Sequence, residues 1–435
     1  MTEPALLDLN DSNLQLWRAG EAVQSPGYAL LDGKQYTFGS AARSAARLRP
    51  RDINTRYWWQ LNTEGLQPAL GPARHTADLV HAHLLDIHKQ AGQPEEIIIA
   101  ASGSMQRDQL ALLLGIVEQC PFKAVGLVNR SVALASTVAC SGNLYHLEIQ
   151  LHQAVITELR QSDGHLTLHC TTPLPGCGLL QLQERLVEII AAAFVRQTRF
   201  DPRRKAESEQ QLYDALPAAL RALGDAPETN IEVMGYRARI NNNELRTAGD
   251  VLFKSVPETT GVLHPDDRII IDPVAGLLPG LLEKLSQAQL IDSGALHLSV
   301  GQHLDALTQV ETGSSEQALH FVTSLPHLAP GSQEAQQSSE TPHSPPEAIP
   351  EPAQAAPTHL LLDAVATPLS QSGTPLGKSW KLVFEQGNWL LHGTQAIRVN
   401  GKNYVAGQAL NSGDSFTWDS DAGPLAACLI LVEQP

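Results

Sequence analysis

Cysteine, aromatic side chains and long apolar runs are all scarce in this chain of 435 residues. Its five cysteines form no Cys-x-x-Cys pair and leave one over, so we expect reduced, mostly buried thiols. No apolar run approaches the roughly 20 residues that a membrane helix needs, and the N-terminus lacks the basic-then-apolar pattern of a signal peptide. These absences predict a cytoplasmic protein with no membrane insertion.

Positive charge is also in short supply. The chain has 30 basic and 46 acidic residues, a formal net charge of -16, which disfavours nucleic acid and anionic membrane surfaces as partners. One basic run follows a predicted helix, and it is more typical of a solvated helix end than of a nucleic-acid patch. The run consists of Arg196, Arg199, Arg203, Arg204 and Lys205.

Composition divides the chain into three parts. Residues 331–357 contain six prolines and four glutamates, no lysine or arginine, and almost no large apolar side chain. Such a segment cannot bury enough surface to fold, so we predict a flexible linker there. A large N-terminal body at 1–330 and a small C-terminal module at 358–435 lie on either side of it.

The N-terminal body alternates between two kinds of pattern. Short apolar runs predict strands and runs with helical spacing predict helices, so we expect α/β layering. Ser104 is a candidate N-cap of the helix predicted at 106–119. The predicted strands are Ala5–Leu9, Glu96–Ala101, Ala124–Val128, Leu144–Ile149 and Ile269–Asp272. The predicted helices are 74–91, 106–119, 179–198, 206–223 and 279–288.

The C-terminal module consists of short strand-like runs separated by glycine-containing turns. Asn400-Gly401 suits a type I′ hairpin turn, because both central residues of that turn must accept positive φ. We therefore predict a small all-β sandwich at 358–435. The strand-like runs are Trp380–Phe384, Trp389–Leu391, Ile397–Val399, Phe416–Trp418 and Leu429–Val432.

The most informative local pattern is an apolar strand that runs into a polar turn near the N-terminus. Asn10, Asp11, Ser12 and Asn13 follow the strand directly. A carboxylate with short polar side chains at a strand tip is where a phosphate or a metal ion would be held. Asp8 has two interpretations: a water-mediated magnesium contact, or a carboxylate that caps the turn after the strand.

Four stretches occur in the order found in one known superfamily. They resemble a phosphate-facing turn, a strand and loop leading to a helix that opens with Gln-Arg, a strand with an alanine-rich helix start, and a late strand with an adenosine-contacting loop. Residues 5–310 thus resemble the nucleotide-binding domain of DnaK-type heat-shock chaperones, in the actin, sugar-kinase and chaperone superfamily. The resemblance implies a two-lobed actin-like ATPase fold over 1–330, with an inserted-type subdomain at roughly 206–265. The four stretches are 7–13, 97–107, 124–135 and 269–281.

The glycines that this family places around phosphate are missing. A phosphate turn needs glycine because backbone amides must approach the anion closely. Asn10 stands in the first turn, residues 147–153 of the second phosphate strand contain no glycine, and the adenosine loop reads Pro273-Val274-Ala275. We therefore expect no cofactor and no ATP hydrolysis. If ATP and magnesium do bind, the resemblance places them on Asp8, Asn10, Asp11, Ser12, Asn13 and Glu148.

Two stretches of the C-terminal module also follow a known pattern. Residues 397–402 resemble a valine-Asn-Gly hairpin and residues 410–416 a Gly-Asp turn, both found in forkhead-associated domains. Phosphothreonine-binding members of that family hold the phosphate with an arginine and a Ser-x-x-His segment, where this chain offers only Lys378 and Ser379. The resemblance implies a degenerate forkhead-associated-like module used for protein contact.

Two further groups of residues are less specific. Four histidines lie on or beside one predicted helix, but no set at zinc-ligand spacing joins them, so we expect solvated helix histidines and no metal site. Trp58 and Trp59 are a candidate partner anchor, although core packing is favoured; on a strand, one would face the core and the other the surface. The histidines are His75, His81, His83 and His88.

Fold-specifying runs are retained while ligand-specifying glycines are lost, and a site can decay while its supporting layers persist. This combination predicts a catalytically inactive chaperone-ATPase-like scaffold or adaptor that acts through protein contacts. Two alternatives stay open: a divergent ATP-binding DnaK-like ATPase, and an actin-like cytoplasmic scaffold of a secretion or pilus assembly. The expected partner is a protein in each scaffold hypothesis.

Overall fold

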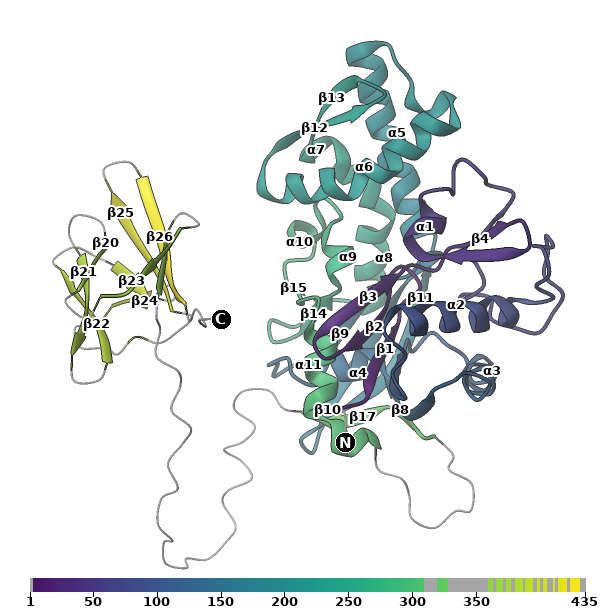
Figure 1. Ribbon diagram of the computed structural model, residues 1–435, viewed down its shortest axis with the longest axis horizontal. Helices are drawn as coiled ribbons and strands as arrows, with labels where there is room; N and C mark the ends of the chain where they lie inside the picture. The colour runs from purple at the N-terminus through teal and green to yellow at the C-terminus, as the bar shows by residue number, and fades with distance from the viewer. Residues whose placement is uncertain are drawn as a thin grey trace, which may run out of the picture. The chain divides into compact units, whose positions relative to one another are not determined.

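The computed structural model describes residues 3–308 and 319–327 and, from 359 onward, mainly the strands of the C-terminal module. The chain forms two compact units, Met1–Glu340 and Thr341–Pro435 (Figure 1). The boundary between them falls within 331–357, and this predicted linker lies outside the described residues. The protein is of mixed α/β type with a small β region at its C-terminus.

Two six-stranded sheets in the N-terminal unit share one arrangement. In each, three consecutive strands form an antiparallel meander, and two later strands run parallel to the first strand of that meander. The sixth strand differs: it extends the parallel edge of the first sheet, and it pairs antiparallel with the last meander strand of the second. The first sheet has the order β16 (Phe321–Val322), β8 (Lys123–Asn129), β7 (Glu96–Ala101), β1 (Ala5–Leu9), β2 (Leu14–Arg18), β3 (Glu21–Ser25). The second has the order β15 (Ala288–Leu290), β14 (Arg268–Ile271), β9 (Leu144–Ile149), β10 (Gln153–Ser162), β11 (His165–Pro175), β17 (Ser324–Pro326).

Helices and two smaller sheets complete this unit. The helices are α1 (Gly39–Arg43), α2 (Thr76–Gln90), α3 (Arg107–Val117), α4 (Arg130–Ala135), α5 (Leu179–Thr198), α6 (Ala206–Asp225), α7 (Asn242–Leu245), α8 (Asp250–Thr260), α9 (Pro273–Gly276), α10 (Leu281–Lys284), α11 (Ala295–Gln302) and α12 (Leu304–Thr308). Short 3-10 helices are η1 (Pro202–Arg204) and η2 (Arg246–Gly249). The smaller sheets are β5 (Gln35–Phe38), β4 (Ala29–Asp32) and β6 (Ile53–Asn54), and the hairpin β12 (Glu228–Val233) with β13 (Tyr236–Asn241).

The apolar pattern explains how these elements pack. Every residue of β1 is buried, as expected for a strand with both faces covered. Leucines and other apolar residues on α5 recur at intervals of four, which places them on one buried face. Leu6 and Ile98 of the first sheet share a core cluster with Leu144 and Ile270 of the second, so a common core joins the two sheets.

In the C-terminal unit, residues from two sheets line a single core. The larger sheet has the order β19 (Val365–Pro368), β18 (His359–Leu362), β26 (Gly423–Ile430), β25 (Ser415–Ser420), β23 (Ile397–Val399), β24 (Lys402–Asn403). The smaller consists of β20 (Thr374–Leu376), β21 (Trp380–Glu385) and β22 (Asn388–Gly393). Val399 pairs with Lys402 across a two-residue connection, which confirms the predicted hairpin; its turn residues 400 and 401 lie outside the described part.

Most predicted elements of the body are confirmed, and two details are wrong. The helix expected at 279–288 is helical only at Leu281–Lys284, because Gly280 has a left-handed φ of 83° and Leu285 leaves helical geometry. Ser104 does not cap α3; the helix begins after Gln106, whose backbone N–H donates to the Gln109 side chain at 3.0 Å. None of the described helices has the length and apolarity that crossing a bilayer requires.

Candidate functional site: a buried ionic cluster between the two sheets

Charged side chains from both sheets meet in the interior of the N-terminal unit. Asp8 lies near the carboxyl end of β1 and Glu148 near that of β9, while Asp272 directly follows β14. Arg130 directly follows β8 and begins α4. All four are at most 6% exposed. Carboxyl ends of strands are where open α/β sheets usually bind their ligands, so this is the first place to look for a site.

The Arg130 guanidinium occupies the centre of the cluster. Its Nε donates to Asp8 Oδ1 at 2.6 Å and its Nη2 to Asp8 Oδ2 at 3.1 Å, a two-point fork. Its Nη1 donates to both oxygens of Asp272, at 3.1 and 2.9 Å, and lies 3.5 Å from Glu148 Oε2. One guanidinium therefore contacts carboxyl groups from both sheets, and its single positive charge faces three acidic side chains.

Neutral and imidazole groups contact further carboxylate oxygens of the cluster, while the buried Glu148 Oε2 accepts no hydrogen bond from any described residue. His146 Nε2 lies 3.3 Å from Asp272 Oδ1, and its Nδ1 lies 2.8 Å from the Ser131 hydroxyl. Asn10 Nδ2 donates to Asp272 Oδ2 at 3.4 Å. Gln150 Nε2 donates to Glu148 Oε1 at 2.6 Å. The cluster is thus a hydrogen-bonded network as well as an ionic one.

Burial and charge act in opposite directions on the pKa values of the cluster. Burial raises the pKa of Asp272, but attraction to Arg130 and His146 outweighs it, so this pKa lies well below its ordinary value. Burial lowers the pKa of Arg130, but the three carboxylates outweigh it, and Arg130 stays charged. For Asp8 burial dominates, and its pKa is raised although Arg130 opposes the shift.

Several backbone amides of the two turns beside the cluster have acceptors within the chain. In the turn after β1, the amide of Ser12 donates to Asn10 Oδ1 at 3.0 Å and that of Asn13 to the Asn10 carbonyl at 2.9 Å. In the turn between β9 and β10, the amide of Gln150 donates to the Gln153 carbonyl at 2.9 Å. An anion cradle needs free N–H groups, and these amides do not supply them.

A carboxylate of the chain accepts from the Leu151 amide in the second turn. Leu151 N donates to Asp11 Oδ1 at 2.7 Å, which ties the turn after β1 to the turn after β9. Asp11 is 7% exposed, and burial raises its pKa to about 7 despite this hydrogen bond. The Asp11 carboxylate therefore sits where a phosphate on the second turn would bind.

Apolar packing closes the space beside this hydrogen bond. The Leu151 side chain is fully buried against Tyr28, Leu30 and Ala42. The bulk that the sequence predicts in the second turn is therefore present, and it fills space between the β4–α1 region and the start of α5.

Polar contacts also join residues 43–47, at and after the end of α1, to helix α6. Gln210 of α6 accepts from the Arg47 amide at 2.8 Å and donates to the Arg43 carbonyl at 3.2 Å. The Arg47 guanidinium lies 3.9 Å from the ring centroid of Tyr213, a cation–π contact. Three sets of contacts thus join residues 5–135 to the part of the unit from residue 144 onward, which we call its two halves. They are the ionic cluster, the Asp11–Leu151 hydrogen bond and the contacts of Gln210 and Tyr213.

The residues present do not fit a nucleotide with magnesium, the group that the family resemblance implies. Hydrated Mg²⁺ needs carboxylate oxygens that face open space, and here Arg130 nitrogens lie against those oxygens. The phosphates need free amides, and the amides of Ser12, Asn13, Gln150 and Leu151 are engaged.

The structure brings the six sequence-predicted site residues into one region but gives them different roles. Asp8 and Glu148 contact Arg130. The capping acceptor of the first turn is Asn10, not Asp8, and the Ser12 hydroxyl also donates to Asn10 Oδ1 at 2.8 Å. Asp11 accepts from Leu151, and Asn13 donates its amide to Asn10.

Sequence reasoning missed Arg130, Asp272 and His146 as site residues. Arg130 and Asp272 stood inside stretches that resemble the chaperone family, but their sequence separation of 142 gave no sign that they pair. The available signal was an arginine directly after a buried strand, at a position where a free charge would be costly. A buried arginine at such a position needs a buried acidic partner, because an unpaired buried charge is costly.

Two other expectations need correction. His83 and His88 are buried, not solvated: His83 lies 2.7 Å from both the Ser25 and Tyr57 hydroxyls, and His88 Nε2 lies 2.9 Å from the Pro94 carbonyl. Trp58 is buried and Trp59 is 38% exposed, as the alternation predicts, but both lie in a turn and not on a strand. Among the described residues no group of three potential ligands could hold a metal ion.

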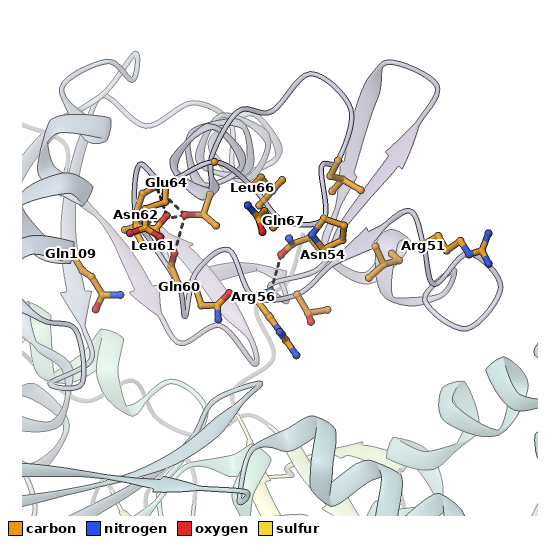
Figure 2. A pocket seen from close by; sticks show the side chains of 16 residues that line it. Arg51, Asn54, Arg56, Gln60, Leu61, Asn62, Glu64, Leu66, Gln67 and Gln109 are labelled. Atoms are coloured by element: carbon orange, nitrogen blue, oxygen red, sulfur yellow. Dashed lines mark hydrogen bonds between the residues drawn. The ribbon is translucent and has the colours of Figure 1, made fainter.

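A cavity of about 770 Å³ lies away from the ionic cluster, within the segment 51–76. Figure 2 shows that the head groups of Arg51 and Arg56, which line it, do not converge on one point. The Thr76 hydroxyl is already bonded to the carbonyls of Gln60 and Asn62 at 2.9 and 3.0 Å. The cavity has no convergent set of charged groups.

In the C-terminal unit, the phosphate-binding candidates Lys378 and Ser379 lie outside the described residues.

Comparison with known proteins adds no family: no protein-family model matches the chain, and no curated protein matches it by sequence.

Proposed function

We propose that this protein is a catalytically inactive scaffold or adaptor, with an actin-like, chaperone-ATPase-like body whose ligand cleft is closed by its own side chains, and that it acts through protein contacts. The observation that carries the proposal is the position of Arg130, which lies against Asp8 and Asp272 at the strand ends of both sheets. A cation supplied by the chain takes the place where the family would put metal and phosphate.

Two further features support the proposal. Five strands of the two large sheets repeat one order, which agrees with the two-lobed fold implied by the resemblance. The halves are also tied by Asp11 to Leu151 and by Gln210 to residues 43 and 47, so closure does not depend on a ligand. A body held closed in this way presents constant surfaces, which suits a scaffold better than a nucleotide-driven cycle.

Thermal unfolding with and without excess ATP and magnesium tests the proposal. A ligand present at 100 times its Kd stabilises the folded state by about 2.7 kcal/mol, so even weak nucleotide binding raises Tm measurably. We expect no change in Tm. A rise in Tm that disappears in Asp8→Ala, with the fold of that variant confirmed by circular dichroism, would instead support the divergent ATPase.

A further inference from the structure

An exposed aromatic surface lies at the tip of the β12–β13 hairpin. Met234 is 57% exposed and Tyr236 45% exposed. The Tyr236 ring stacks on that of Phe200, in the connection after α5, with centroids 4.3 Å apart and planes 6° apart. These three residues form what we call the hairpin-tip surface.

The hairpin tip is held in a fixed position. Met234 and Gly235 form a two-residue turn in which both have positive φ, 51° and 80°, as a type I′ turn requires. Gln211 of α6 accepts from the Met234 amide at 2.9 Å. Gln197 of α5 exchanges two hydrogen bonds with the backbone of Arg239, at 2.7 and 2.9 Å. The exposed side chains are therefore presented by a backbone that is anchored on both helices.

Basic residues flank Phe200 in the sequence, in a chain that is strongly acidic as a whole. Residues 196–205 contain five basic side chains and one acidic one, whereas the whole chain has a net charge of -16. Asp201 is shared by Arg203 and Arg204, at 3.7 and 3.9 Å. Within the described part of the chain, Arg199 and Lys205 have no ion-pair partner. Arg196 is paired with Glu244 at 3.3 Å, so the local excess of positive charge rests on Arg199, Lys205 and the two arginines that share Asp201.

We infer that the hairpin-tip surface and its basic rim bind a short acidic segment of a partner protein that carries an aromatic or large apolar side chain. Exposed tyrosine and methionine beside arginine are the side chains that interfaces favour at their centres. Exposed guanidinium and ammonium groups at the rim give association rate and charge specificity. This inference rests on the proposed scaffold role and names the kind of partner that the scaffold would hold.

The charge distribution favours a short acidic peptide over a nucleic acid or a membrane. A polyanion or an anionic vesicle extends beyond the patch and meets the field of a chain with a charge of -16. A short segment meets only the local excess of positive charge. The apolar stack also suits an aromatic or apolar partner side chain; because nucleobases stack on aromatic rings too, the test includes a single-stranded oligonucleotide.

Fluorescence anisotropy tests the inference with the full chain and a fluorescein-labelled synthetic peptide rich in glutamate with a central phenylalanine. We expect saturable binding that weakens with salt, and no binding of the peptide with lysine in place of glutamate. Tyr236→Ser and Arg203→Glu should each weaken binding about tenfold, equivalent to about 1.4 kcal/mol. Arg221→Glu is the matched control: it makes the same charge change at an exposed position about 24 Å along α6 from Lys205, and should leave affinity unchanged.

Several outcomes would overturn the inference. Equal binding of the lysine peptide, equal loss in Arg221→Glu, or tighter binding of a single-stranded oligonucleotide or phosphatidylserine vesicles to the same residues would each do so. Each variant is checked for an unchanged Tm. The Tm of the same samples is also measured with ATP and magnesium, which separates the two proposals. If neither the peptide nor the nucleotide binds, the peptide site is wrong while the proposed inactive scaffold stands.

Discussion

Replacing Arg130 with methionine is the most direct test of the buried ionic cluster. The side chain makes four hydrogen bonds to Asp8 and Asp272 and an ion pair with Glu148, all buried. Removing one partner of a buried ion pair typically costs about 3–5 kcal/mol, because the remaining charge is left uncompensated. With three carboxylates left behind, we expect Arg130→Met to cost about 5 kcal/mol at neutral pH, the upper end of that range.

The pH dependence of this loss gives a sharper test. In the wild type the folded-state pKa of Asp272 is lowered, so its contribution to stability is present above its unfolded pKa and is lost as the pH falls through the lower folded value. In Arg130→Met, Asp8 and Asp272 lose the counter-charge that lowers their folded-state pKa values, so these values rise. The variant should therefore regain part of its lost stability as the pH falls from about 7 to about 5.

Urea unfolding at both pH values measures these effects. Arg237→Met is the matched control, because Arg237 and its partner Glu232 are both exposed and an exposed pair contributes about 1 kcal/mol or less. Combining Arg130→Met with Asp8→Asn and Asp272→Asn should recover stability, since it removes charges that have no partner. A loss in Arg130→Met that is below about 1 kcal/mol and independent of pH would refute the reasoning.

Three other residues give independent predictions. Burial raises the pKa of Asp11 to about 7, so its folded form binds a proton more tightly than the unfolded chain; stability should fall as the pH rises from about 4 to about 7, by up to about 4 kcal/mol, and Asp11→Asn should flatten this slope in urea unfolding. Leu151→Ala should cost about 2–5 kcal/mol in the same assay, against less than about 0.5 kcal/mol for the exposed Leu298→Ala; an equal small loss would contradict the packing described. Burial lowers the pKa of His83 to about 3, so nitrogen NMR shifts should show a neutral imidazole at pH 5, and imidazolium shifts there would be inconsistent with its burial.

The elements that the sequence predicted well are those whose signal is local. β1 and β7 are short apolar runs bounded by polar residues, and α5 carries its apolar side chains on one face over its full length. The helix expected at 279–288 failed because one glycine with positive φ outweighed a favourable apolar pattern.

The site was harder to predict because its contacts are distant in sequence. The turn residues Asp8 to Asn13 were recognisable from their composition, and the missing glycines were visible in the sequence. The pairing of Arg130 with Asp8 and Asp272 joins positions 122 and 142 residues apart, and no periodic pattern reports such a contact. His83 was expected in solvent because a lone histidine on a helix does not reveal which hydroxyls will face it.

A crystal structure of the full chain grown with excess ATP and magnesium would show whether Arg130 closes the strand ends of both sheets. We expect the Arg130 guanidinium against Asp8 and Asp272, with the Leu151 amide on Asp11 and no nucleotide between the sheets. An adenine nucleotide bound at the strand ends, with Arg130 displaced from the two aspartates, would contradict this expectation.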